Sequence, residues 1–113
     1  MGLLVPKPRL EGGETSQWHR LANREQGDKA VGGRLDVTTK RVVFTASRLE
    51  GGSGWEVPRG DVSAVAVQAP GPDSGPGGIR HQVRLELRNG DTELFVIRDP
   101  EGAVKELQGL LEG

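Results

Sequence analysis

The segment 32–47 constrains the fold of this 113-residue chain more than any other part of it. Leu35 and Val37 lie two positions apart with polar residues around them, which is the spacing of a half-buried strand. The polar residues 38–41 then indicate a turn, and the next five residues place Phe44 on the apolar face of a second strand. The segment therefore predicts an antiparallel strand pair.

Further segments of the same kind follow along the chain. Residues 24–33 are mostly polar and glycine-rich, and residues 69–78 are rich in proline and glycine, so we expect both to be loops. Residues 50–54 indicate a flexible turn, and Asn89-Gly90 matches a two-residue hairpin turn. Alternating or compact apolar residues predict strands at 17–23, 34–38, 42–46, 55–57, 61–68, 81–88 and 91–97.

The apolar period becomes helical after residue 98. Asp99 is a candidate N-cap and Pro100 suits the first helical position. One apolar stripe follows at helical spacing, formed by Ala103, Val104, Leu107, Leu110 and Leu111.

A single small sheet cannot cover both of its faces, so it must curl or pack against another element. We therefore expect a mainly β fold: an antiparallel β-barrel or orthogonal sandwich of six to seven strands, with the C-terminal helix over one open end. Four residues are expected to meet in its core: Leu35, Phe44, Leu85 and Phe95. Trp18 and Trp55 are expected to fill the core, with exposed anchors for a partner as the alternative.

Composition limits the location and the classes of site. The chain has no cysteine, which excludes disulfides, thiolate metal sites and a cysteine nucleophile. No apolar run approaches the roughly 18 residues of a membrane span. The apolar stretch at the N-terminus is too short for a signal peptide, so we expect a cytoplasmic protein. We divide the chain into a proline-containing arm, 1–13, and a single domain, 14–113.

Charge is unevenly distributed, although the net charge is −1. Residues 20–48 hold seven basic residues against three acidic ones, whereas residues 86–112 hold seven acidic residues against three basic ones. Such asymmetry orients some domains toward an anionic surface, but it more often marks a solvated face.

Several motifs occur in a fixed order along the chain. They are a Gly-Arg-Leu strand entering a Thr-x-x-Arg turn, an apolar strand ending in Phe, a tryptophan and a proline-led step into an apolar strand, then an Asn-Gly hairpin, a Phe-containing strand and an Asp-Pro helix start. These positions are Gly33, Arg34, Leu35, Thr38, Arg41, Val42, Val43, Phe44, Trp55, Pro58, Val62, Asn89, Gly90, Phe95, Asp99 and Pro100.

Over residues 14–112, this series resembles the GRAM-like branch of the pleckstrin-homology (PH) superfold. The glycine-rich composition resembles that of proteins from GC-rich bacterial genomes. The resemblance implies a binding or scaffolding module without catalytic activity, which engages anionic lipids or protein segments.

A basic cluster is the candidate lipid- or anion-binding site. Its members are Arg24, Lys29, Arg34, Lys40 and Arg41. Charged donors suit phosphate groups, and the resemblance implies a cationic loop between the first two strands, where Glu25 and Asp28 weaken the field. For Arg41 we favour a structural role, bonding to backbone carbonyls or pairing with Asp36.

The sequence contains no motif for metal binding, catalysis or nucleic-acid binding. His19 and His81 belong to no spaced pair of metal ligands, and the serines and glycines form no nucleophile elbow or phosphate loop, so we expect no metal, no cofactor and no enzymatic activity. With four aromatic residues and a pI near 6.1, nucleic-acid binding is not expected. The sequence favours a module that docks a protein segment or self-associates; the alternative is binding to an anionic membrane through residues 20–41.

Overall fold

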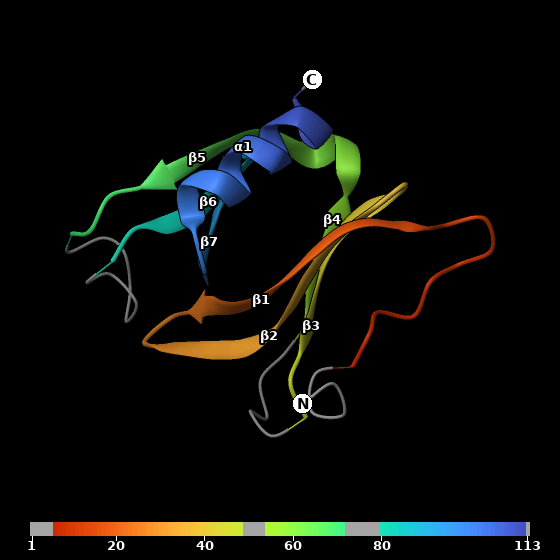
Figure 1. Ribbon diagram of the computed structural model, residues 1–113, viewed down its shortest axis with the longest axis horizontal. Helices are drawn as coiled ribbons and strands as arrows, with labels where there is room; N and C mark the ends of the chain where they lie inside the picture. The colour runs from red at the N-terminus through yellow and green to blue at the C-terminus, as the bar shows by residue number, and fades with distance from the viewer. Residues whose placement is uncertain (1–5, 49–53, 72–79, 113) are drawn as a thin grey trace.

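The computed structural model describes residues 6–48, 54–71 and 80–112. In this part of the chain, seven strands form one antiparallel sheet and one helix follows them (Figure 1). The elements are β1 (Ser16–Gln26), β2 (Lys29–Thr38), β3 (Arg41–Ala46), β4 (Trp55–Pro58), the short 3-10 helix η1 (Arg59–Asp61), β5 (Val62–Gln68), β6 (Gln82–Leu87), β7 (Thr92–Ile97) and α1 (Pro100–Leu111). The expected turn at 50–54 and loop at 69–78 lie mostly outside the described residues.

The strand order in the sheet is β4-β3-β2-β1-β7-β6-β5. β1 connects the two halves, because it pairs with β2 along its length and with β7 only at residues 22–24. α1 packs against β5, β6 and β7, where Figure 1 shows it lying across that half of the sheet. The expectation of a mainly β fold with a C-terminal helix is confirmed, with seven strands.

The prediction of a loop at residues 24–33 was wrong. β1 and β2 form a continuous hairpin in which Gln26 pairs with Lys29, and the turn consists of Gly27 and Asp28 alone. Gly27 has a φ of 66°, a left-handed conformation that suits glycine. Polar composition misled the prediction, because segment 24–33 contains one large apolar residue, Val31, which is buried at 2% exposure, while most of its other residues are half-buried or exposed.

The four residues expected to meet in the core do so. Leu35, Leu85 and Phe95 have no exposed surface and Phe44 has 1%. The Phe44 and Phe95 rings lie 5.8 Å apart between centroids, and the partly buried Trp55 ring lies 5.9 Å from Phe95. These tilted arrangements are favourable for aromatic pairs.

The helix begins and packs as its sequence predicts. The Asp99 side chain accepts a hydrogen bond from the Gly102 amide, so Asp99 is the N-cap. Ala103, Val104 and Leu107 are buried against the sheet, with Leu110 and Leu111 partly buried beside them. Within the described ranges, no helix is long and apolar enough to cross a membrane.

Candidate functional site

The structure distributes the five candidate basic residues over two faces of the sheet. Side chains alternate between faces along a strand. Arg24 therefore shares the inner face of β1 with the buried Ala22, whereas Arg34 lies on the outer face of β2 beside the inward-facing Leu35. Arg41 lies next to the inward-facing Val42 and so also faces outward. The five residues do not form one continuous patch.

Arg24 is held inside the molecule by an acid from the C-terminal half. Its Nε and Nη2 atoms donate to the two carboxylate oxygens of Glu93 at 2.8 and 3.3 Å. Its guanidinium also lies 5.6 Å from the centroid of the Trp55 ring. Only 15% of each charged side chain is exposed, so this pair connects β1 to β7 rather than presenting a free cation.

Arg34 binds Asp36, two residues along the same strand. Its Nε and Nη2 atoms donate to the Asp36 carboxylate at 2.8 and 3.1 Å. Asp36 is fully buried and also accepts a hydrogen bond of 2.7 Å from the Ser16 hydroxyl. A buried carboxylate needs such partners, so Arg34 has a structural role here.

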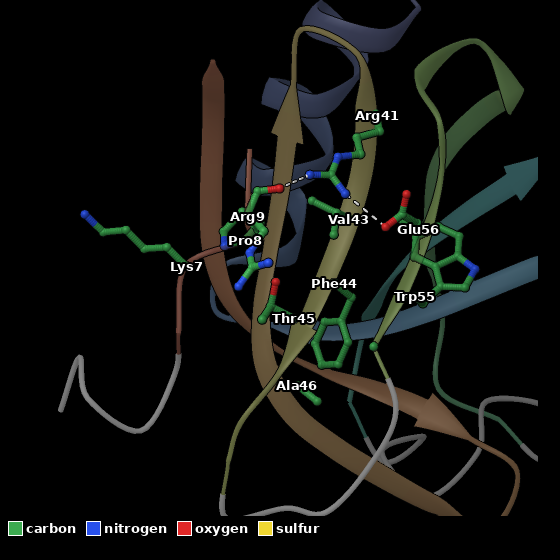
Figure 2. A pocket seen from close by; sticks show the side chains of 11 residues that line it. Lys7, Pro8, Arg9, Arg41, Val43, Phe44, Thr45, Ala46, Trp55 and Glu56 are labelled. Atoms are coloured by element: carbon green, nitrogen blue, oxygen red, sulfur yellow. Dashed lines mark hydrogen bonds and ion pairs between the residues drawn. The ribbon is translucent and has the colours of Figure 1, made fainter. Parts of the chain in front are cut away.

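Arg41 anchors the N-terminal arm against β3. Its Nε donates to Glu14 Oε2 at 2.9 Å. Its Nη1 donates to Glu56 Oε1 at 2.9 Å and its Nη2 to the Arg9 carbonyl (Figure 2). The expected bond to a backbone carbonyl is therefore confirmed. The expected pairing with Asp36 was wrong, because Arg34 occupies that carboxylate.

Glu14 is a buried acid that the sequence does not single out. The Arg41 guanidinium, the Thr38 hydroxyl and the Glu11 amide all donate to its carboxylate, and together they lower its pKa from 4.5 to about 2. Glu14 in turn raises the pKa of Arg41. Glu14 lies near the boundary that we placed between arm and domain, where the sequence shows no pattern that would reveal its partner.

Lys29 and Lys40 are the more accessible members of the set. The Lys40 side chain is 50% exposed, and its Nζ lies 3.9 Å from Glu11 and 3.4 Å from the Gly12 carbonyl. Lys29 is exposed at the start of β2, and among the described residues no acid lies within ion-pair distance of it. Only these two candidates present a solvent-facing charge.

A pocket of about 540 Å³ lies between the arm and the outer surface of β3 and β4. Its lining is Lys7, Pro8, Arg9, Arg41, Val43, Phe44, Thr45, Ala46, Gly54, Trp55 and Glu56. Figure 2 shows the Lys7 side chain directed away from it, and Arg41 crossing it to reach Glu56 and the Arg9 carbonyl. The central cation of the pocket, Arg41, is already paired, and the acid in the lining, Glu56, is one of its partners.

A further ion pair also joins the basic part of the chain to the acidic part. Glu106 on α1 accepts from the Arg20 guanidinium at 2.6 Å and from the Trp18 indole at 2.8 Å. Together with Arg24 and Glu93, these contacts join the basic N-terminal half to the acidic C-terminal half. Much of the asymmetry seen along the chain is therefore neutralised within the molecule.

Comparison with known proteins identifies the fold. A scan of protein-family models and a search of curated proteins give no match. Among solved structures, the C-terminal domain of an unknown protein from Leishmania infantum aligns with a TM-score of 0.71 at 12% identity, covering 89% of this chain and 87% of that one.

Two other solved structures also match. The Vps36 N-terminal PH domain has a TM-score of 0.63 at 14% identity and covers 95% of this chain and 89% of that one. The hSac2 domain from human phosphoinositide phosphatase Sac2 has a TM-score of 0.59 at 16% identity and covers 91% and 69%, respectively. At these identities the likeness concerns the fold alone, and the chain has a PH-like fold.

Proposed function

We propose that this chain is a non-catalytic interaction module of the GRAM/PH-like type that works in the cytoplasm and docks a protein segment or self-associates. The observation that carries the proposal is the engagement of Arg24, Arg34 and Arg41 with carboxylates of the same chain. Side chains that are used to hold the fold together are poor candidates for an anion site. The available binding surface is then the sheet itself and its edges.

The titratable groups support a non-catalytic role. The pKa of Glu14 is lowered and that of Arg41 is raised, and each is shifted chiefly by the other. Catalytic groups usually combine a shifted pKa with a position in a cleft facing substrate. Here the shifted pair holds an arm against a strand instead.

The test combines capture and size measurement. A tagged full chain is crosslinked in its native cell, and purified protein is examined by light scattering over a wide concentration range. We expect either a recurrent protein partner or concentration-dependent self-association. Repeated capture of nothing, together with a monomer at the highest concentration, would overturn the proposal.

Binding to an anionic membrane is the second candidate function. It is supported by the exposed Lys29 and Lys40, and by the likeness to a domain of a phosphoinositide phosphatase. Co-sedimentation with phosphatidylserine vesicles at low and high salt tests it, since charge-driven binding weakens with salt.

The charge reversals for this membrane test belong at the exposed lysines. Arg24→Glu would break the Glu93 pair and perturb the fold, whereas Lys29→Glu and Lys40→Glu change accessible charges. Lys105→Glu on α1 is the matched control, because it makes the same change of charge on a different element. Equal sedimentation of Lys29→Glu and Lys105→Glu, or no binding at low salt, would exclude this function.

A further inference from the structure

The two edge strands of the sheet differ in how their outward backbone groups are satisfied. β4 and β5 end the strand order, so each pairs with one neighbour in the described structure. An edge strand presents unpaired amide and carbonyl groups, which are a template for another chain. Because we propose a protein-docking module, the state of each edge indicates where docking is feasible.

The β5 edge is covered by side chains of the helix. The Glu112 carboxylate, at the C-cap of α1, accepts from the Val65 amide at 2.7 Å, and the Gln108 amide group donates to the Val65 carbonyl at 2.9 Å. These two bonds occupy the outward groups at the middle of β5. An incoming strand would have to displace α1, so this edge is protected.

The β4 edge lacks such a cover. In an antiparallel pair, hydrogen-bonded and non-bonded residue pairs alternate. The Arg59 amide donates to the Lys40 carbonyl, which fixes the alternation along β3 and β4. By that alternation, Val42–Val57 is a bonded pair, and Val43–Glu56 is a non-bonded pair.

The amide and carbonyl of Glu56 therefore point away from β3. Pro58 supports this alternation of bonded and non-bonded pairs. It lies opposite Arg41 in a non-bonded pair, where a residue without an N–H loses no hydrogen bond to β3. The Arg41 amide donates to the Thr38 hydroxyl and not to Pro58, as expected when Arg41 and Pro58 form a non-bonded pair. Among the described residues, nothing pairs with the outward groups of Glu56.

A second pocket, of about 330 Å³, includes Val57 of β4 in its lining. It is lined by Val57, Asp61, Leu87, Arg88 and Asn89, with no contribution from β3. Val57 and Leu87 give it an apolar part.

We infer that the free edge of β4 binds an extended segment of a partner protein by strand addition. The partner residue opposite Glu56 would share its face and exchange both backbone bonds with it. The Glu56 side chain is 60% exposed and its Oε2 is free of the Arg41 contact, so this partner residue is basic. The next partner residue faces the other way, toward Val57, and is apolar.

A foreign segment fits this edge better than a second copy of the chain. Pairing of two β4 strands about Glu56 would place two like charges directly opposite each other, which is unfavourable. A partner with a basic residue at that position removes the repulsion and adds an ion pair. This inference rests on the proposed docking function and specifies its site.

The test uses a phage-displayed library of random twelve-residue peptides selected on the full chain. A synthetic copy of each selected peptide is then titrated against Glu56→Pro and Glu56→Thr. Both substitutions remove the Arg41–Glu56 pair, but only proline removes the outward amide; Trp55 before it is already extended, as proline requires. The β3–β4 bonds are untouched by either change, and circular dichroism confirms the fold.

We expect selected peptides to combine a basic with an adjacent apolar residue. Their affinity should fall about tenfold or more in Glu56→Pro, because a buried backbone acceptor loses its donor. In Glu56→Thr it should fall about fivefold or less, the size of a cross-strand ion pair. In the wild type, the peptide should slow hydrogen exchange of the Glu56 amide, a readout that needs no substitution.

The opposing outcomes separate the site from the function. Peptides that bind both variants and the wild type alike overturn the β4 site but leave a docking module in place. A library that yields no binding peptide overturns strand addition of a foreign segment. The proposed docking function is then tested by the crosslinking experiment alone. A dimer that Glu56→Pro dissociates would replace the foreign segment by a second copy.

Discussion

At the scale of single residues, Glu14 and Arg41 make a contact whose strength depends on pH. The pKa of Glu14 in the folded chain is about 2, below its ordinary value of 4.5. A carboxyl group whose pKa is lowered by folding contributes stability above its unfolded pKa and loses it as pH falls through the folded pKa. The contribution of Glu14 should therefore be complete above pH 4.5 and disappear as the pH approaches 2.

The variant Glu14→Gln measures this contribution. Its free energy of unfolding should lie below that of the wild type at pH 7, and the difference should shrink steadily between pH 4.5 and 2. Urea unfolding at several pH values provides the measurement. A difference that stayed constant across this range would show that the charge of Glu14 does not stabilise the arm.

Gly33 lies where β2 approaches β3 too closely for any side chain. A Cβ atom there would lie 2.2 Å from the Thr45 carbonyl oxygen and 2.7 Å from the Phe44 ring. Gly33→Ala must shift backbone or a core aromatic, and we expect a loss of about 1–3 kcal/mol. The control Gly60→Ala adds a Cβ that meets nothing within 4 Å and should change stability by less than about 0.5 kcal/mol. Equal effects of the two variants in urea unfolding would contradict this account.

At the scale of elements, two glycines of α1 are expected to respond differently to the same substitution. A Cβ at Gly109 would meet nothing within 4 Å, so Gly109→Ala should stabilise by about 1 kcal/mol through helix propensity. A Cβ at Gly102 would lie 2.2 Å from the Asp99 carboxylate and displace the N-cap. The loss of the cap should cancel the similar gain in propensity, leaving a net change near zero. Thermal unfolding of both variants tests the difference, which would be refuted if Gly102→Ala stabilised as much as Gly109→Ala.

Elements with a strong apolar period could be predicted from the sequence. Elements that form only because a strand pairs with a neighbouring strand could not. The helix was predictable because Asp99, Pro100 and the leucine stripe all indicate it locally. The β1–β2 hairpin was not, because residues 24–26 belong to β1 through pairing with other strands, with β2 throughout and with β7 at Arg24, and the turn is only Gly27-Asp28. Propensity and polarity indicate a loop there, and tertiary pairing overrides them.

At the scale of the whole molecule, the candidate site shows the same limit. The sequence located the cations but could not show that Glu14, Glu93 and Glu106 would reach them from distant segments. An ion pair formed across 69 residues, as between Arg24 and Glu93, leaves no local pattern in the chain. The local charge of a segment therefore overestimated the charge that its surface presents.

The final prediction concerns cooperativity between the two halves of the sheet. Trp18 bonds to α1 through Glu106, whereas Trp55 packs on Phe95 beside Arg24, so the two indoles report on different parts of the core. One continuous core contains both rings, because Phe95 on β7 contacts Phe44 on β3 as well as Trp55.

Single-tryptophan variants make this cooperativity measurable. Trp18→Phe leaves Trp55 as the only tryptophan, and Trp55→Phe leaves Trp18. In each variant, we expect unfolding followed by tryptophan fluorescence to coincide with unfolding followed by circular dichroism, as for a two-state domain. Adding Phe95→Ala should lower stability by about 3–5 kcal/mol and keep the two probes coincident, since the substitution opens a cavity shared by both halves. Separate transitions would mean that the β5–β7 half with α1 unfolds independently, and that the short pairing of β1 with β7 at residues 22–24 is only a hinge between two folding units.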